Sequence, residues 1–342
     1  MGIESLVREN VKLMQAYSSA RDEFKQQADV YLDANENPYD DGLNRYPDPY
    51  QKALKEKLSK IKGIAPSNML LGNGSDEVLD LIFRVFCEPK NDNIIIVPPT
   101  YGMYKVLAAV NDVAVKEVVL TEEFSLDIEG IKATADEKTK LVFICSPNNP
   151  TGNLMGKKAV EELLQDLNCI VVIDEAYIDF CKEESWADRL NEFPNLIVCQ
   201  TLSKAWGLAG IRLGMCFASE YIIGVLNKIK PPYNVNQLTQ SKALEVLKSS
   251  EIYEEELLEI LKEKEVLKVA LEKFSFVEKI YESDANFWLV KVADANGLYQ
   301  YLAGKGVVVR NRTKEYGCKN CLRITVGTSS QNEVLIKVLK DF

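Results

Sequence analysis

Residues 196–218 read LIVCQTLSKAWGLAGIRLGMCFA, and they are the most informative part of the sequence for the fold. It contains two apolar runs, Leu196–Cys199 and Gly214–Ala218, joined by a segment of small residues with a single lysine, Lys204. Apolar runs without polar alternation are typical of strands that other elements cover on both faces. The stretch therefore predicts two buried strands with a glycine-containing connection between them.

The preceding part of the chain repeats this pattern. Three more apolar runs occur at Ile94–Val97, Leu141–Cys145 and Ile170–Ile173. The segments between them, such as Gly156–Leu167, have the amphipathic pattern of helices. Strands that alternate with helices form a mostly parallel sheet with helices on both faces. We therefore predict an α/β fold whose large domain, residues 41–245, has a mostly parallel central sheet flanked by helices.

The C-terminal part has a different pattern. Residues 251–273 predict one long, charged amphipathic helix. Short apolar runs then predict four strands, which are Val277–Tyr281, Phe287–Lys291, Val307–Arg310 and Leu322–Val326. These elements indicate a smaller α+β domain over residues 246–342. The first forty residues match neither pattern, and we expect residues 1–40 to pack on this smaller domain.

Length, composition and charge exclude several classes of protein. A chain of 342 residues with 46% hydrophobic content can bury the cores of two lobes. Its net charge of -10 argues against binding to nucleic acid or to an anionic membrane. No apolar run approaches the roughly 20 residues that a membrane helix needs, and the N-terminus lacks the apolar core of a signal peptide. We expect a cytoplasmic protein.

The cysteines and the absence of histidine limit the chemistry further. Several of the eight cysteines lie inside apolar runs, as buried thiols of a reduced cytosolic enzyme do. Cys318 and Cys321 form a lone C-x-x-C, which without a second pair or a histidine lacks the ligands of a zinc site. A chain without histidine has no Ser-His-Asp or Cys-His triad. A lysine with a lowered pKa is the leading substitute as a base near neutral pH.

Lys204 is the leading candidate for this role. Burial among small and apolar residues would lower its pKa and leave a free amine that can form a Schiff base with an aldehyde. Thr201, Ser203 and Arg212 surround it with hydroxyl and guanidinium groups, which bind phosphate. The alternative is an ordinary loop lysine in contact with solvent.

Two other predicted strands end in polar residues. The segment CSPNNPTG (145–152) presents Asn149 at the carboxyl end of a strand, where ligands bind in open α/β sheets. A plain turn is the alternative. In VVIDEAYIDF (171–180), Asp174 ends a buried strand and Tyr177 follows three residues later. A buried carboxylate needs a partner, such as a protonated pyridine nitrogen or the cation of a structural ion pair.

A glycine-containing segment and an aromatic residue complete the candidate site. The segment LGNGSDEVLDLIF (71–83) predicts a loop that runs into an apolar helix. Ser75 or Asp76 would begin this helix, whose first backbone N–H groups can bind phosphate. Tyr101, after the strand at 94–97, could stack on a flat ring. Together these residues describe one site for an aldehyde that carries a pyridine ring and a phosphate.

Over nearly its whole length the chain resembles the fold-type I pyridoxal-phosphate enzymes, and most closely the histidinol-phosphate aminotransferases. The segments that carry this resemblance are AYSSARDEF (16–24), LDANENPY (32–39), NRYPDP (44–49), GNGSDE (72–77), PPTYGMY (98–104), CSPNNPTG (145–152), DEAYIDF (174–180), TLSKAWGLAGIRLG (201–214) and LRITVGT (322–328). The resemblance implies a homodimer with shared active sites. It also implies the reversible conversion of L-histidinol phosphate and 2-oxoglutarate to imidazole acetol phosphate and L-glutamate, in histidine biosynthesis.

The resemblance implies how matching residues hold pyridoxal 5'-phosphate. Lys204 would form the Schiff base and transfer the proton, and Asp174 would pair with the pyridine nitrogen. Asn149 and Tyr177 would bind the phenolic oxygen, while Tyr101 would stack on the ring. The residues implied for the cofactor phosphate are Ser75, Asp76, Thr201, Ser203, Arg212 and, from the neighbouring subunit, Tyr46.

The resemblance also implies a substrate site, but with two departures. Arg323 would bind the carboxylate of glutamate, and Arg310, Tyr17 and Asn35 would help to hold the phosphate of the substrate. Ala16 stands where the family often has proline, and no acidic residue follows Arg310. An aromatic amino-acid aminotransferase and a threonine-phosphate decarboxylase on the same scaffold therefore stay open. A non-catalytic regulator is disfavoured, because the chain has no basic DNA-binding segment.

Overall fold

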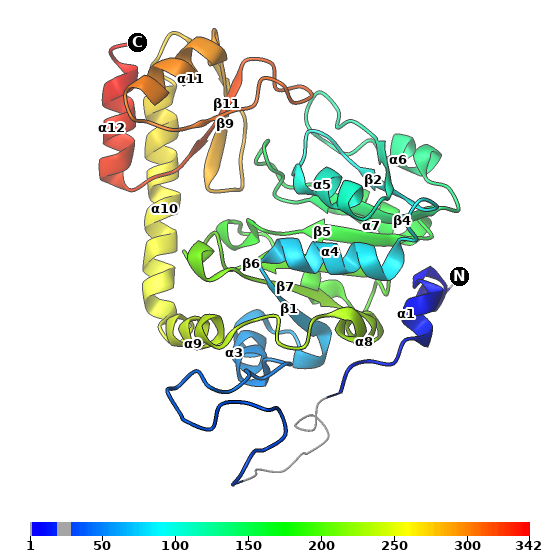
Figure 1. The fold of residues 1–342 in the computed structure, drawn as a ribbon. Coiled ribbons are helices and arrows are strands. Elements are labelled where there is room, and N and C mark those ends of the chain that lie inside the picture. The colour runs from blue at the N-terminus through cyan, green and yellow to red at the C-terminus, as the bar shows by residue number, and fades with distance from the viewer. Residues whose placement is uncertain (1, 19–28) are drawn as a thin grey trace.

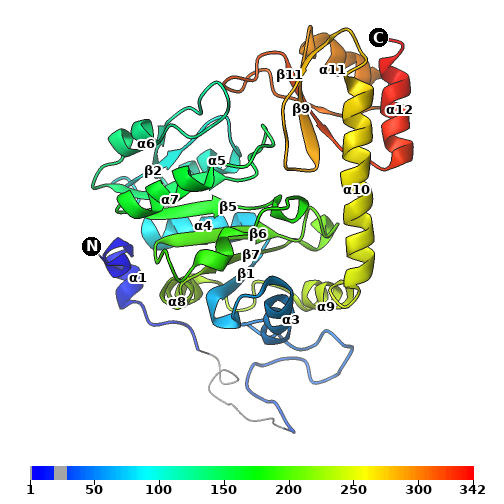
Figure 2. The same cartoon turned by 180° about the vertical axis from the view of Figure 1, so that it is seen from behind.

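The computed structural model describes residues 2–18 and 29–342, and it has two domains (Figure 1). The large domain is built on a seven-stranded sheet and the small domain on a four-stranded sheet. A long helix, α10 (Ser250–Leu271), runs along the side of the large domain into the small one, as Figure 2 shows from behind. The predicted fold class is confirmed. The division that we predict at residue 246 falls at the end of α9 (Gln237–Val246) and stays a prediction.

The large sheet has the strand order β1-β7-β6-β5-β4-β2-β3. Its strands are β1 (Met69–Asn73), β2 (Asn93–Ile96), β3 (Ala114–Glu117), β4 (Thr139–Cys145), β5 (Ile170–Asp174), β6 (Leu196–Thr201) and β7 (Leu213–Ala218). Neighbours from β3 to β6 are parallel, whereas β7 is antiparallel to both β6 and β1. The connection from β6 to β7 holds only the 3-10 turn η5 (Ala209–Ile211). It is therefore too short for the helical crossover that a parallel neighbour needs.

Two strands of this sheet do not follow the predicted pattern. The segment that begins at Leu71, predicted as a loop, begins inside β1, whose apolar part is only Met69–Leu71. Strand β3 lies at the edge of the sheet and is half-exposed, so it lacks the continuous apolar run of a buried strand. A continuous apolar run indicates a strand that is buried on both faces, so this pattern does not detect the edge strand β3.

Helices cover both faces of the large sheet and form two apolar cores with it. Along β4, Leu141 and Phe143 belong to one core, and Val142 and Ile144 belong to the other, because successive side chains of a strand point to opposite faces. The helices on the first face are α4 (Ser75–Phe86), α5 (Met103–Val110) and α8 (Glu220–Ile229). Those on the second face are α3 (Lys52–Lys62), α6 (Ile128–Thr134), α7 (Lys157–Asp166) and α9. This sandwich buries the strands whose ends carry the candidate residues.

The small domain has an antiparallel sheet in the order β10-β11-β9-β8. Its remaining elements are β8 (Val277–Ile280), β9 (Phe287–Val292), α11 (Ala295–Gly304), β10 (Arg310–Asn311), β11 (Cys321–Thr325) and α12 (Ser329–Leu339). The predicted strand Val307–Arg310 is wrong except at its last residue. The Val307 N–H closes the end of α11 by donating to Leu302 O at 2.9 Å, so it cannot join a strand ladder.

The N-terminal segment packs on the large domain, which corrects our expectation that residues 1–40 pack on the small one. Its elements are η1 (Ile3–Leu6) and α1 (Glu9–Leu13). Leu6, Val7 and Val11 are buried in the core beneath α4 and α8, and the Lys228 ammonium donates to Lys12 O at 3.0 Å. Residues 29–50 lie at the opposite end of the large domain from the small one (Figure 1). Within the described ranges, no helix is long and apolar enough to cross a membrane.

Candidate active site

A cavity of about 570 Å³ lies at the carboxyl ends of β4, β5 and β6, facing β10 and β11 of the small domain. It is lined by residues that the sequence analysis placed in the site, which are Ser75, Asp76, Tyr101, Asn149, Asp174, Tyr177, Thr201, Ser203, Lys204, Arg212, Arg310 and Arg323. Segments more than two hundred residues apart in the chain thus meet in one place. The parallel strands β4, β5 and β6 bring Asn149, Asp174 and Thr201 together, because their carboxyl ends share one edge of the sheet. The small domain adds the arginines from the other side.

Lys204 lies in the turn after β6, and its side chain lines the cavity. Its ammonium lies 5.6 Å from the centre of the Tyr177 ring. Burial by the cavity walls, and then the nearby charge of Arg323, lower the pKa of Lys204. A lysine amine in this environment loses its proton more readily than one in water, as a nucleophilic or basic amine requires.

Asp174, the last residue of β5, is buried at the base of the cavity. Its carboxylate accepts hydrogen bonds from the Tyr104 hydroxyl at 2.8 Å and from the Ala176 N–H at 3.2 Å. Burial raises the pKa of Asp174 to about 6, and the two hydrogen bonds oppose this rise. A carboxylate held in this way, with no cation in hydrogen-bond contact among the described residues, fits a positively charged ring nitrogen.

Tyr104 is a site residue that the sequence analysis missed. It is fully buried on α5, and it packs edge-to-face against Tyr101 with 5.6 Å between the ring centres. The available signal is its position three residues after Tyr101 within a quoted motif, on the helix face that points to the sheet. A buried phenol needs a hydrogen-bond acceptor, and Asp174 provides one.

The N-terminus of α4 forms an anion-binding corner of the cavity. Gly74 precedes the helix with φ of 82°, and this N-cap residue provides no side-chain hydrogen bond to the first N–H groups. Arg212 has a left-handed conformation with φ of 54°, and its guanidinium lies 3.8 Å from the Asp76 carboxylate. The hydroxyl groups of Thr201 and Ser203 are 2.9 Å apart beside it. Free N–H groups at a helix start, two hydroxyls and a guanidinium fit a phosphate group.

The opposite end of the cavity is built by β10 and β11. These strands are antiparallel, and Arg310 lies directly opposite Arg323. The Arg323 guanidinium donates to Asn149 Oδ1 at 2.5 Å and lies 5.2 Å from the centre of the Phe287 ring. Arg312 also lines the cavity, and the sequence analysis missed it. The signal for it is the spacing of two residues from Arg310, since alternate residues of a strand share a face.

Comparisons with known proteins agree with this geometry. Residues 18–339 match the family described as aminotransferase class I and II. The chain is 55% identical to the histidinol-phosphate aminotransferase of Flavobacterium johnsoniae, over 99% of this chain and 98% of that protein. It is also 55% identical to the same enzyme of Christiangramia forsetii, over 99% of this chain and 97% of that protein. The chain belongs to the histidinol-phosphate aminotransferase family.

The fold of this family is also seen in solved structures. The crystal structure of the histidinol-phosphate aminotransferase from Clostridium acetobutylicum matches with a TM-score of 0.80 and 26% identity. The match covers 87% of this chain and 90% of that one. The large, mostly parallel sheet and the small domain with an antiparallel sheet are therefore the fold of the family.

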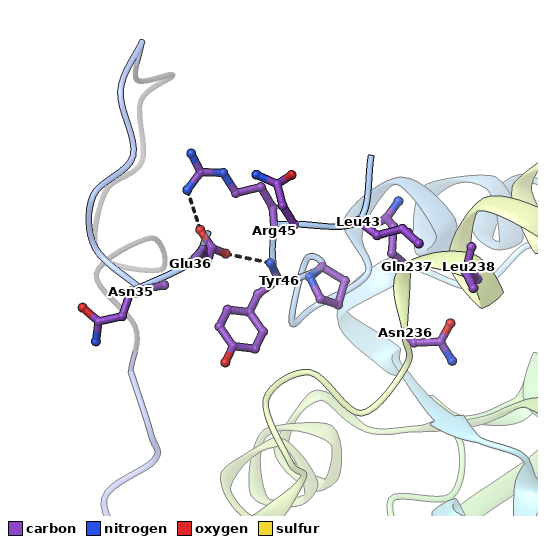
Figure 3. A pocket seen from close by; sticks show the side chains of 11 residues that line it. Asn35, Glu36, Leu43, Arg45, Tyr46, Asn236, Gln237 and Leu238 are labelled. Carbon is purple, nitrogen blue, oxygen red and sulfur yellow. Dashed lines mark hydrogen bonds and ion pairs between the residues drawn. The ribbon is translucent and has the colours of Figure 1, made fainter. Parts of the chain in front are cut away.

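Three residues that the family resemblance implied lie outside this cavity. Tyr46 and Asn35 line a second cavity of about 420 Å³, which shares no lining residue with the first (Figure 3). Tyr46 stacks on Tyr233 with 4.5 Å between the ring centres. Tyr17 is exposed, and residues 19–24 of its motif lie outside the described residues. A single chain therefore does not bring these residues to Lys204.

The lone C-x-x-C has no metal-binding geometry. Cys318 and Cys321 are buried free thiols, and burial raises the pKa of both. Across residues 2–18 and 29–342, no group of three potential ligands could hold a metal ion. These two cysteines are buried as apolar residues in the same core cluster as the second face of the large sheet.

Proposed function

We propose that this chain is a pyridoxal-phosphate-dependent aminotransferase that exchanges the amino group between L-histidinol phosphate and 2-oxoglutarate, in histidine biosynthesis. One observation carries the proposal. A lysine with a lowered pKa, a buried carboxylate and an anion-binding helix start line one end of a cavity whose other end is lined by arginines. The first group suits the cofactor, and the arginines suit an anionic substrate.

The residues of the first group would hold the cofactor at three points. Lys204 would bond its aldehyde carbon, Asp174 would face its ring nitrogen, and the start of α4 with Arg212 would hold its phosphate. Asn149 and Tyr177 would bind its phenolic oxygen, so that the ring has one orientation. When bound, the cofactor supplies a protonated ring that withdraws electrons from the substrate Cα.

Lys204 also moves the proton. Once the substrate amine has replaced it on the cofactor, its freed Nζ would take the proton from the substrate Cα, and a lowered pKa and a fixed distance from the substrate favour this transfer. Asp174 keeps a proton on the ring nitrogen, because an ionised carboxylate favours the charged form of its partner. Tyr101, which lines the cavity, would stack on the cofactor ring.

Arg323 and Arg310 would recognise different anionic groups of the two substrates. Glutamate has carboxylates at both ends, whereas histidinol phosphate has a phosphate and no α-carboxylate. Arg323, held by Asn149 and Phe287, is placed to bind a carboxylate through its planar fork. Arg310, opposite it, is placed to bind the phosphate. An aromatic amino acid has no side-chain anion and would leave these charges uncompensated.

A rapid-mixing experiment tests the function. The purified holoenzyme is mixed with histidinol phosphate, phenylalanine or O-phosphothreonine, and the visible absorbance of the lysine-bound cofactor is followed. We expect a fast change with histidinol phosphate and changes at least about tenfold slower with the other two. A tenfold difference in rate corresponds to about 1.4 kcal/mol in activation free energy. A faster reaction with phenylalanine or phosphothreonine would contradict the substrate assignment.

Substitution of Lys204 tests the site. Lys204→Ala and the charge-matched Lys204→Arg are both expected to abolish turnover, because neither side chain can bond an aldehyde. Both should also lose the absorbance of the lysine-bound cofactor. Turnover and absorbance that persist in either variant would contradict the assignment of Lys204.

We further propose a homodimer with shared active sites in the cytoplasm. The implied role of Tyr46 at a neighbouring subunit's cofactor phosphate supports the dimer, because Tyr46 lies away from its own chain's cavity. The eight cysteines are free thiols, which suit a reducing compartment.

A further inference from the structure

We propose that Arg312 is a third anion-binding residue of the substrate end of the cavity, and that it makes this end selective for a phosphate monoester over a carboxylate. The proposal rests on the proposed function and deepens it. It assigns a residue to substrate recognition that neither the sequence motifs nor the family resemblance indicated.

Backbone pairing directs the Arg312 side chain into the cavity. The Arg312 N–H donates to Cys321 O at 2.9 Å, which continues the pairing of β10 with β11. Alternate residues therefore share a face, and Arg310 and Arg312 both line the cavity. Asn311 between them points away, and its amide donates to Asn296 Oδ1 at 2.8 Å. The departure from the family pattern after Arg310 thus lies outside the cavity.

The charge of Arg312 is poorly compensated by the protein. Its side chain is 17% exposed, and its ion pair with Glu315 is long, with 3.6 Å between Nη1 and Oε1. Among the described residues, the buried Nε atoms of Arg312 and Arg323 have no hydrogen-bond partner. Burial, followed by the charges of Arg323 and Arg310, lowers the pKa of Arg312. Buried donors without acceptors are costly, so this end of the cavity favours an anion with several acceptor atoms.

The balance of charge favours a dianion. The carboxylates that line the cavity are Asp76, beside Arg212, and Asp174, at the base. Within the described part of the chain, the substrate end has three guanidinium groups and no lining carboxylate. A phosphate monoester brings nearly two negative charges and three acceptor oxygens at neutral pH. A carboxylate brings one charge and two oxygens, which Arg323 and Arg310 alone can satisfy.

Binding of two unreactive ligands to the holoenzyme tests the proposal. The ligands are 3-(imidazol-4-yl)propyl phosphate, which is histidinol phosphate without its amino group, and glutarate. Calorimetry is expected to show that Arg312→Gln lowers the affinity for the phosphate ester about tenfold to a hundredfold, which is the effect of losing a charged hydrogen bond. The affinity for glutarate should fall less than about threefold, since its carboxylate does not need a third guanidinium group. Equal losses, or no loss for the ester, would overturn the proposal.

A matched control and a conservative variant separate binding from folding. Lys314→Gln removes one positive charge from the same loop at an exposed position outside the cavity, and it should leave both affinities unchanged. Arg312→Lys keeps the charge but not the fork, and it should lose part of the ester affinity. If Arg312→Gln does not fold, Arg312→Lys decides. A selective loss for the ester supports the proposal, and a loss that is equal for both ligands overturns it.

The pH dependence gives a readout that a structural role would not change. The ester gains its second charge near pH 6, so its affinity for the unchanged enzyme should rise between pH 5 and 7. This rise should be smaller in Arg312→Gln, and an unchanged rise would count against the assignment. The proposed function is tested separately from the role of Arg312. It would be wrong if the unchanged enzyme bound the ester but did not turn over histidinol phosphate.

Discussion

Asp174 and Glu175 are adjacent carboxylates at the end of β5, and they face different surroundings. Asp174 lines the cavity, whereas Glu175 is buried on the other side. The Glu175 carboxylate accepts hydrogen bonds from the Ser185 hydroxyl at 2.5 Å, the Trp186 N–H at 2.8 Å and the Gln200 amide at 2.9 Å. Glu175 therefore holds the segment after β5 in place, and the Asp174 carboxylate with it.

Glu175 predicts a specific pH dependence of stability. Burial raises its pKa to about 7 in the folded protein, above the ordinary value near 4.5, so the folded state binds the proton more tightly. The contribution of this proton to the free energy of unfolding is complete below pH 4.5 and is lost as the pH rises through 7. Glu175→Gln is neutral at every pH. The Tm of the cofactor-free protein, relative to that of Glu175→Gln, should therefore fall between pH 5.5 and pH 8. The exposed Glu184→Gln is the surface control, and a Tm difference that is constant with pH would refute the prediction.

At the scale of elements, β7 and the start of α4 depend on each other. Strand β7 pairs with both β1 and β6, and it passes beneath the helix N-terminus. Gly214, in β7, has no side chain to keep these backbones apart. A Cβ atom at Gly214 would overlap the Ser75 N atom and lie 2.5 Å from the Gly74 carbonyl carbon. The glycine therefore permits the close approach that places the N–H groups of α4 in the cavity.

Gly214→Ala tests this packing. The added methyl group must displace the start of α4, and overpacking of this kind costs about 1–3 kcal/mol. We expect the affinity for pyridoxal phosphate to fall by about tenfold or more, since 1.4 kcal/mol corresponds to a factor of ten, and the Tm to fall as well. Absorbance titration of the cofactor-free protein measures the affinity. Gly210→Ala, where a Cβ meets nothing within 4 Å, is the matched control. If both variants bind the cofactor as the unchanged protein does, the start of α4 does not hold its phosphate.

At the scale of the whole molecule, the segment 29–50 exposes an apolar surface at the end of the large domain. Its exposed large apolar residues are Val30 at 69%, Leu32 at 88%, Tyr39 at 83%, Leu43 at 54% and Tyr46 at 51%. Several large apolar side chains exposed on one segment are a feature of interfaces. This supports the proposed homodimer, in which Tyr46 of one subunit completes the phosphate site of the other.

Hybrid dimers test the shared site. Subunits with Tyr46→Phe are mixed with subunits carrying Lys204→Ala, at limiting cofactor. One site of each hybrid would then combine an intact Lys204 with an intact Tyr46 from the other chain, and activity should exceed the weighted sum of the two parents. Tyr104→Phe replaces Tyr46→Phe in the control, because Tyr104 acts within its own chain and cannot be restored in this way. Hybrids that only match the weighted sum would exclude the cross-subunit role of Tyr46.

The α/β class and the long helix α10 could be read from the sequence, and with the family resemblance the sequence also predicted twelve of the residues that line the cavity. It could do so because burial on both faces leaves a continuous apolar run, and because polar residues after such runs come together wherever the strands are parallel. Only the tertiary structure decided that β7 is antiparallel, that Leu6, Val7 and Val11 pack on the large domain, and that Tyr104 and Arg312 join the site. These features depend on the length of a connection or on contacts between distant segments. Local periodicity reports whether a residue is buried, but not which residue buries it.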